Sequence, residues 1–387
     1  MDLSENFIVD LPKFVEEKIA GFLACLDSCE SGLMAIDLGA ITRNYGRLCA
    51  FLAPTKVAAV IKADAYGFGA EKVGPVLYES GSRDFFVATI AEGLELRKIL
   101  PENARIFALC GLLPGSEQTF LLHNIVPVLN SYQQAKNYQN MAILAGKTLN
   151  CALHFDTGMS RTGFCQEDSQ KFFVQDFSQL NVVLVMSHLC CGDDAENPLN
   201  AAQMAKFTKI AEKFPTVDRS LVATSALHFG QDFRMEMARV GHGLYGLDGG
   251  VLGCNLEPAL YVFAKIIQIR TVPAHSTVGY SAIYKTSKLA KLATLAIGYA
   301  DGYFRAPRTE GRVVKIGGYF APIVGRISMD FCVVDVSEIP DGAFKEGDFA
   351  QIVGDEILPK NLVDGSDLIL HEIPILLGRR FRREYFW

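Results

Sequence analysis

Short apolar runs alternate with helical stretches through the first two thirds of this sequence, and the alternation limits the fold more than any other feature. Eight such runs occur, near residues 57, 85, 105, 125, 150, 182, 221 and 238. Between them, segments such as AEGLELRKILP and AQMAKFTKIAEKF carry apolar residues at helical spacing. Eight strands alternating with helices over about 200 residues predict a (β/α)8 barrel. An open doubly wound sheet is the alternative, although no GxGxxG follows the first strand and there is no P-loop.

The pattern changes after about residue 255. Segments such as ALYVFAKIIQIRTV, RVVKIGGYFAPIVG and FCVVDV are strand-like and are separated by Gly and Pro turns. The sequence therefore predicts an α/β protein in which a TIM-like barrel precedes a mostly β C-terminal domain. We expect a helical N-terminal extension over 1–32, the barrel over 33–254 and the β domain over 255–387. The strand-like segment SGLMAIDLGAI, near residue 31, could join either domain.

Charge and cysteine usage exclude several classes of protein. The 387 residues carry a formal net charge of −6, whereas a nucleic-acid-binding protein is expected to be basic. The ten cysteines form no CxxC pair, so we expect reduced thiols and no metal site. The N-terminal residues resemble neither a signal peptide nor a membrane span. Their pattern instead predicts an amphipathic helix from about Leu11 to Leu26. These features predict a cytoplasmic protein without membrane partners.

Polar side chains gather where the apolar runs end, which in a barrel of this kind is the functional face. They are Lys62 after the first run, His154, Asp156 and Arg161 after the fifth, His188, Asp193 and Asp194 after the sixth, Thr224 and Ser225 after the seventh, and Arg239 in the eighth. Each has a simpler interpretation, since a lone lysine usually reaches solvent and Arg239 could pair with Asp232 or Glu236. Their joint placement at successive strand ends favours a functional site.

An amine, a histidine, two arginines and a set of hydroxyl and backbone N–H groups suit pyridoxal 5'-phosphate. A lysine with a lowered pKa can bind the aldehyde covalently. Small residues after the seventh and eighth strands are the usual place for a phosphate on this fold. An arginine beside the ring nitrogen leaves that nitrogen unprotonated, because a guanidinium donates hydrogen bonds and does not lose its proton.

The motifs VIKADAYGFG, DTGMSRTG, SHLCCGD, VGYSAIY, IGYADGY and GRISMD resemble those of the alanine racemases, in the same order. The resemblance covers roughly residues 33–387. It implies an isomerase that contains pyridoxal 5'-phosphate, interconverts L- and D-alanine, and supplies D-alanine for peptidoglycan. It also implies a homodimer in which each active site is shared between the two chains.

The resemblance further implies a role for each motif residue. Lys62 matches the cofactor-binding lysine and first base, and Tyr280 matches the second base, contributed by the partner chain. The matches to cofactor contacts are Tyr66, Ser225, Gly241 and His242 at the phosphate, Arg239 at the ring nitrogen, His188 beside Arg239, and Arg161. Arg161 and the backbone of Met329 match substrate-carboxylate contacts. The entry corridor matches Asp193, Tyr299, Arg305 and Arg326.

Two positions depart from the family pattern. Many members carry a lysine, often carbamylated, where this chain has His154, and a histidine where it has Phe68. Neither departure touches the two bases, so they leave the reaction intact and put the tuning of substrate affinity in question. The alternatives are a serine-preferring or broader racemase, a basic amino-acid decarboxylase, and a non-catalytic pyridoxal-phosphate carrier. The GYADGY and VGYSA motifs argue against the last two.

Overall fold

The computed structural model describes residues 11–247, 250, 252–305, 311–363 and 368–387. The chain divides into two compact units. The barrel unit is Ala40–Glu257, and the β unit combines Met1–Gly39 with Pro258–Trp387. The barrel unit is therefore inserted, in sequence, between two parts of the β unit.

Eight parallel strands form the barrel unit, in the order β8-β7-β6-β5-β4-β3-β2-β9. They are β2 (Lys56–Val60), β3 (Asp84–Val87), β4 (Arg105–Ala108), β5 (Ile125–Leu129), β6 (Leu149–His154), β7 (Leu180–Met186), β8 (Asp218–Ser220) and β9 (Met237–Val240). Strand β2 pairs with both β3 and β9, so the first and last strands are neighbours. A bridge between Ala223 and Arg239 joins the end of β8 to β9. The barrel predicted from the alternation is confirmed, and the open doubly wound sheet is excluded.

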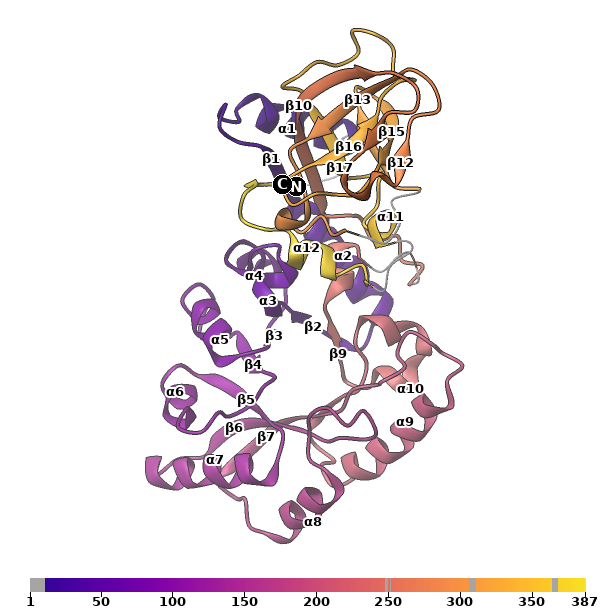
Figure 1. Ribbon diagram of the computed structural model, residues 1–387. Coiled ribbons are helices and arrows are strands. Elements are labelled where there is room, and N and C mark those ends of the chain that lie inside the picture. The colour runs from indigo at the N-terminus through magenta and orange to yellow at the C-terminus, as the bar shows by residue number, and fades with distance from the viewer. Residues whose placement is uncertain (1–10, 248–249, 251, 306–310, 364–367) are drawn as a thin grey trace, which may run out of the picture. The chain divides into compact units, whose positions relative to one another are not determined.

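Helices follow the strands and lie outside them, as Figure 1 shows for α4 to α9. The helices of this unit are α2 (Leu38–Leu52), α3 (Lys62–Tyr66), α4 (Ala70–Glu79), α5 (Ile90–Arg97), α6 (Glu117–Leu122), α7 (Tyr132–Ala145), α8 (Gln166–Val174), α9 (Pro198–Ala211) and α10 (Gln231–Arg234), with 3-10 helices η1 (Thr224–Phe229) and η2 (His242–Tyr245). Most residues of these strands are apolar because a barrel strand is covered on both faces, whereas the short strand β8 consists of Asp218, Arg219 and Ser220. One prediction was displaced: the run near 221 follows β8, and Thr224 already begins η1.

The β unit contains the remaining strands: β1 (Gly32–Asp37), β10 (Leu260–Val272), β11 (Thr277–Val278), β12 (Tyr284–Lys285), β13 (Ala290–Leu295), β14 (Val313–Ile316), β15 (Tyr319–Val324), β16 (Cys332–Asp335), β17 (Phe349–Val353) and β18 (Arg382–Phe386). It also contains α1 (Leu11–Ala24), α11 (Lys360–Val363), α12 (Glu372–Leu376), η3 (Tyr280–Ala282) and η4 (Tyr299–Asp301). The long strand β10 pairs antiparallel with β1, β13 and β17. Strand β1 also pairs parallel with β18.

Strand β1 thus belongs to the β unit, although we expected the barrel to begin at residue 33. Its pairing partners explain the difference, because both β10 and β18 come from the C-terminal part of the chain. All six residues of β1 are buried, so the strand has no face left for solvent. The barrel unit begins at Ala40, inside α2.

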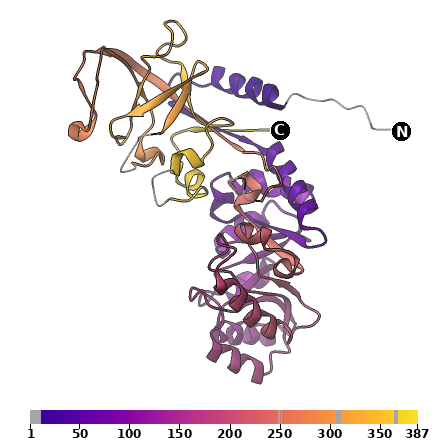
Figure 2. The same cartoon turned by 90° about the vertical axis from the view of Figure 1, so that its right-hand side faces the viewer.

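Helix α1 covers one part of the β unit with its apolar face, and Figure 2 shows it, in indigo, beside the strands. Val15 and Ile19 are buried in a cluster with Tyr261, Phe263 and Phe386. Residues 1–10 of the expected extension lie outside the described residues. Among the described residues, no helix combines the length and the apolar composition needed to cross a membrane.

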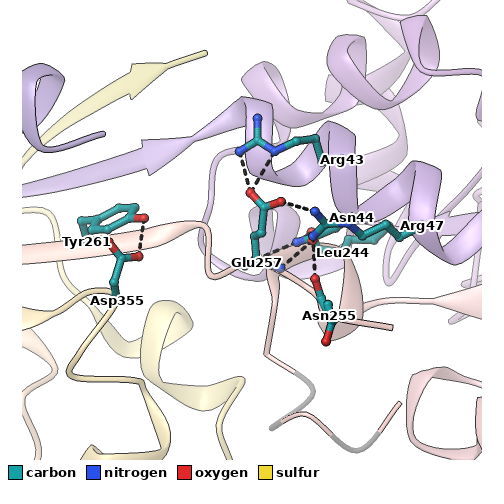
Figure 3. Close-up of polar contacts among 8 residues, drawn as sticks. All are labelled: Arg43, Asn44, Arg47, Leu244, Asn255, Glu257, Tyr261 and Asp355. Atoms are coloured by element: carbon teal, nitrogen blue, oxygen red, sulfur yellow. Dashed lines mark hydrogen bonds and ion pairs between the residues drawn. The ribbon is translucent and has the colours of Figure 1, made fainter. Parts of the chain in front are cut away.

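The end of the barrel unit is tied to α2 by a polar cluster that Figure 3 shows in detail. The carboxylate of Glu257 forms ion pairs with the guanidinium groups of Arg43, at 2.7 Å, and Arg47, at 2.5 Å. The buried amide of Asn44 donates to the Glu257 carbonyl at 2.8 Å and accepts from its backbone N–H at 2.7 Å. The last residue of the unit is therefore held against its first helix. In the β unit, the Tyr261 hydroxyl donates to Asp355 at 2.8 Å.

Candidate active site

Lys62 stands directly after β2, and its ammonium group is half-buried. The preceding residue, Ile61, still belongs to the sheet, since its N–H donates to the Phe86 carbonyl at 2.9 Å. Burial lowers the pKa of Lys62, and the positive charges of Arg161 and Arg239 lower it further, against the opposing charge of Glu92. An amine with a lowered pKa is more often neutral, and it is the neutral form that acts as nucleophile or base. The Lys62 amine therefore loses its proton more readily than that of an exposed lysine.

The four residues after Lys62 form a left-handed turn. Ala63, Asp64, Ala65 and Tyr66 have φ between 54° and 56°, followed by Gly67 at 84°. This conformation costs roughly 1–2 kcal/mol for each residue that carries a Cβ, and such strain collects at functional sites. Glu92 holds the start of the turn, because its Oε1 accepts from the Ala63 N–H at 2.8 Å.

The left-handed turn places Tyr66 beside Gly241, at the end of β9. A Cβ added at Gly241 would clash with the Tyr66 hydroxyl, so only glycine allows this approach. Burial raises the pKa of Tyr66 to about 12, which keeps its hydroxyl protonated and able to donate. The N–H of Gly241 donates to the Thr224 hydroxyl at 2.9 Å, and this bond joins the segments that follow β8 and β9. Ser225 follows Thr224 in η1, His242 begins η2, and both residues are half-buried.

Arg239 is buried inside the barrel and is held by neutral groups. Its guanidinium donates to the Ser220 carbonyl at 2.9 Å, to the Ser220 hydroxyl at 2.6 Å and to the Ser187 carbonyl at 2.7 Å. Within the described ranges, none of its hydrogen-bond partners is a carboxylate. Glu236, one of the alternative partners, binds Arg219 instead. Burial and then Arg161 lower the pKa of Arg239 to about 9, so it stays a cation at neutral pH.

His188 meets Arg239 through its Nδ1, which lies 3.2 Å from the guanidinium. Because the guanidinium can only donate, Nδ1 accepts, and the imidazole is neutral with its proton on Nε2. Burial and then the charge of Arg239 hold the pKa of His188 well below its usual value, which agrees with that protonation state. The pair therefore presents a fixed positive charge on Arg239 and a neutral donor on His188.

His154, at the end of β6, lies 2.8 Å through its Nδ1 from the Asn130 Oδ1. The Asn130 amide nitrogen already donates to the Leu109 and Val128 carbonyls, so its oxygen must face His154, and Nδ1 carries the proton. Burial, Arg239 and Arg161 lower the pKa of His154 to about 4. A neutral His154 thus brings no negative charge to Arg161, whose own side chain is exposed.

The other expected site residues lie in the β unit, apart from Asp193, which follows β7 and is exposed. Three segments are joined there by hydrogen bonds. Arg326 donates to the Ser281 hydroxyl at 2.8 Å, next to Tyr280, and Tyr299 donates from its backbone to the Ser328 carbonyl at 3.1 Å, next to Met329. Arg305 is exposed and borders the residues that are not described. Within the β unit, these bonds bring the segments that carry Tyr280, Arg326, Met329 and Tyr299 together.

Sequence reasoning missed several residues that hold the site. Glu92, Asn130 and Gln203 each support a motif residue through a hydrogen bond. The only signal for one of them was the TIAE segment, because a Thr followed three residues later by Glu is typical of a helix start. The structure shows this capping box at Thr89 and Glu92. Among the described residues, no group of three or more His, Cys, Asp or Glu side chains could hold a metal ion.

Comparisons with known proteins agree with this geometry. Residues 36–249 match the family model "Alanine racemase, N-terminal domain", and residues 259–385 match "Alanine racemase, C-terminal domain". The chain is 36% identical over 377 residues to the alanine racemase of Brucella abortus, which covers 93% of this chain and 95% of the relative. It is 39% identical over 358 residues to the catabolic alanine racemase of Rhizobium johnstonii, which covers 92% and 95%.

Solved structures give the same result. The alanine racemase of Bartonella henselae "with covalently bound pyridoxal phosphate" superposes with a TM-score of 0.86 at 34% identity, covering 92% of this chain and 99% of that one. The enzyme of Streptomyces lavendulae superposes with a TM-score of 0.85 at 27% identity, covering 93% and 98%. The strand-end residues, the two matched domains and these relatives together show that the chain belongs to the alanine racemase family.

Proposed function

We propose that this alanine racemase holds pyridoxal 5'-phosphate on Lys62. Lys62 and Tyr280 of the partner subunit then act as the two bases: one removes the α-proton of alanine and the other returns a proton to the opposite face. One observation carries the proposal. A half-buried lysine with a lowered pKa stands at a strand end next to a buried arginine that has neutral partners. The Bartonella henselae relative, named for its covalently bound pyridoxal phosphate, supports the choice of cofactor.

The residues present fit this cofactor. Tyr66, Ser225 and the backbones of Gly241 and His242 supply donors for a phosphate, and the absence of a Cβ at Gly241 lets the Tyr66 hydroxyl lie against that backbone. Arg239 is a buried cation without a carboxylate partner in the part of the chain described, and a cation of this kind favours a ring nitrogen that carries no proton. When bound, pyridoxal phosphate supplies an electron-withdrawing ring that acidifies the α-proton of an attached amino acid.

Two bases are needed because racemisation removes a proton from one face of the α-carbon and returns one to the other. Because the pKa of Lys62 is lowered, its amine is more often neutral than that of an ordinary lysine, so it can take a proton from one face and return one. Tyr280 is the second base in this proposal, and its phenol is well placed to meet another chain because 65% of its surface is exposed. Arg161 and the backbone N–H of Met329 hold the substrate carboxylate, and Asp193, Tyr299, Arg305 and Arg326 line its entry.

The surroundings of Tyr280 support the shared site. Large apolar side chains are exposed on the same hydrogen-bonded segments, namely Ile283, Tyr299, Met329 and Phe331. Such a patch is more extensive than single exposed residues on a monomer and is typical of a protein interface. We infer a homodimer in which this surface of the β unit completes the active site of a second copy.

The direct test reduces the protein with borohydride after addition of pyridoxal phosphate and locates the modified residue by mass spectrometry. We expect the cofactor on Lys62, and its absence there would overturn the proposal. A chiral assay with L-alanine and L-serine then decides between an alanine racemase and a broader one. The Rhizobium johnstonii relative is named catabolic, so growth of a deletion strain with and without D-alanine decides whether the enzyme supplies D-alanine for peptidoglycan.

Mixing two inactive variants tests the shared site. A Lys62→Ala chain and a Tyr280→Phe chain each lack one base. A mixed dimer contains one site with both bases if every site draws Lys62 from one chain and Tyr280 from the other. We expect partial recovery of racemisation on mixing, whereas two variants that stay inactive together would show that each chain contains a complete site.

A further inference from the structure

Gln203 is a buried residue on α9, and both polar atoms of its side-chain amide form hydrogen bonds with the segments that follow β6 and β7. Only 2% of its surface is exposed. Its Oε1 accepts from the Cys190 N–H at 2.9 Å and from the Cys190 thiol at 3.0 Å. Its Nε2 donates to the His188 carbonyl at 2.9 Å and to the Thr157 hydroxyl at 3.1 Å. The side chain therefore binds a backbone carbonyl and the N–H two residues later, as a paired strand would.

The hydrogen bonds from Gln203 begin where the hydrogen bonds between β7 and β8 end. Strand β7 ends at Met186, and the next residue, Ser187, still donates from its N–H to the Ser220 carbonyl of β8 at 3.1 Å. His188 and Cys190 come after that last bond, in the turn that leads to α9. Gln203 thus supplies the hydrogen bonds that fix the backbone at the position of His188.

A second branch of the network reaches the segment after β6. The Thr157 hydroxyl lies 2.8 Å from the Ser187 hydroxyl, and both side chains are buried. Because Thr157 accepts from Gln203, its own proton is available to Ser187. Arg239 donates to the Ser187 carbonyl and lies 3.2 Å from the His188 Nδ1, so the two residues that Arg239 contacts here are also bound by Thr157 and Gln203.

We propose that Gln203 is a positioning residue for the racemase: it fixes the backbone of His188 so that the imidazole accepts from Arg239. The role rests on the proposed function of Arg239 and His188 at the cofactor ring. Gln203 acts through His188 and is not itself a catalytic residue. Losing it frees the imidazole to leave Arg239, which then has one acceptor fewer for a buried cation.

Asn200 provides a matched control, since it is also a buried amide on α9, three residues earlier. Its Nδ2 donates to the Cys191 and Asp194 carbonyls, at 3.0 Å and 2.7 Å, further along the same turn. Only 2% of its surface is exposed. Asn200→Leu therefore removes two buried hydrogen bonds from the same helix without removing any from His188, Ser187 or Thr157.

The test compares Gln203→Met with Asn200→Leu in the full-length protein. Titrating cofactor-free protein with pyridoxal phosphate measures the dissociation constant, and the steady-state kcat and KM for alanine are measured separately. We expect Gln203→Met to weaken cofactor binding roughly tenfold, the lower end of the loss seen when a group that orients a metal ligand is removed. Asn200→Leu should lower the melting temperature while keeping the dissociation constant within about twofold, as distant changes do.

A double variant separates positioning from general stability. In a His188→Gln background, Gln203→Met should add no further loss of cofactor affinity, because Gln203 acts through His188. Additive losses, or a wild-type dissociation constant for Gln203→Met, would overturn the proposal. Should Gln203→Met not fold, Gln203→Glu is measured instead, since it keeps the acceptor for Cys190 and loses the donor to His188. Wild-type protein that binds no cofactor on Lys62 refutes the proposed function itself, which is a distinct result.

Discussion

Replacing Glu92 tests whether one carboxylate maintains the strained turn that follows Lys62. Glu92 accepts three backbone N–H groups: Ala63 at 2.8 Å, Ala88 at 2.7 Å and Thr89 at 3.3 Å. A hydrogen bond contributes about 1 kcal/mol net to stability, and more when one group is charged. Glu92→Ala removes all three acceptors, so the local structure should lose about 3 kcal/mol, equivalent to a roughly 150-fold rise in the population of the opened turn.

Hydrogen exchange measured by mass spectrometry on peptides that cover residues 61–70 and 87–92 reads this opening directly. We expect exchange there to be faster by about two orders of magnitude in Glu92→Ala. Glu95→Ala is the control, because Glu95 lies on the same helix and binds only the exposed Lys98 in the part of the chain described. Exposed pairs of this kind contribute about 0.5 kcal/mol or less. Equal exchange in the two variants would refute the role assigned to Glu92.

The same substitution has a consequence for Lys62. The negative charge of Glu92 raises the pKa of Lys62 against the larger lowering by burial. Removing that charge should therefore move the pKa of Lys62 further down. In cofactor-free protein, we expect the rate at which pyridoxal phosphate attaches to Lys62 to reach its alkaline plateau at lower pH in the variant than in the wild type, and a shift to higher pH would contradict the assignment.

Two further substitutions test other parts of the structure. The pKa of His154 is about 4 in the folded protein and about 6.5 in an unfolded chain, so the unfolded state takes up the proton first as the pH falls. Stability should be constant above pH 6.5 and decline between pH 6.5 and 4, by about 3 kcal/mol in total, and urea unfolding of His154→Gln should show a smaller decline. Ile19→Ala should lower the free energy of unfolding by about 2–5 kcal/mol, because Ile19 is buried between α1 and β10, whereas Lys18→Ala, on the exposed face, should cost less than about 0.5 kcal/mol.

The barrel was predictable because its strands are buried on both faces and therefore appear as unbroken apolar runs. Strand β8 was not placed correctly, because the most apolar residues of its run, Leu221 and Val222, follow the three residues that pair with β7. Strand β1 was ambiguous for a different reason. Its apolar residues are as suitable for one unit as for the other, and only long-range pairing with β10 and β18 decides between them.

The motif residues were predictable from their order along the chain, but the groups that hold them were not. Gln203 and Asn130 are ordinary polar residues in sequence, and only the fold shows that their amides face His188 and His154. The left-handed conformation of Ala63 to Tyr66 was equally hidden, because neither alanine nor tyrosine favours positive φ. Such exceptions to local preference are expected where surrounding contacts impose the geometry of a functional site.

The pairing of β1 sets an order of events during synthesis. About 220 residues separate Asp37 from Leu260, where the first partner strand of β1 begins, and β18 lies at the very end of the chain. At about 5–20 residues per second, a ribosome takes roughly 10–45 seconds to make that intervening length. Throughout this interval the mostly apolar strand β1 lacks both of its partner strands while the barrel sequence is made. Both edges of β1 therefore stay unpaired in the nascent chain until β10 is made, so β1 is the segment that a chaperone for extended apolar segments would protect.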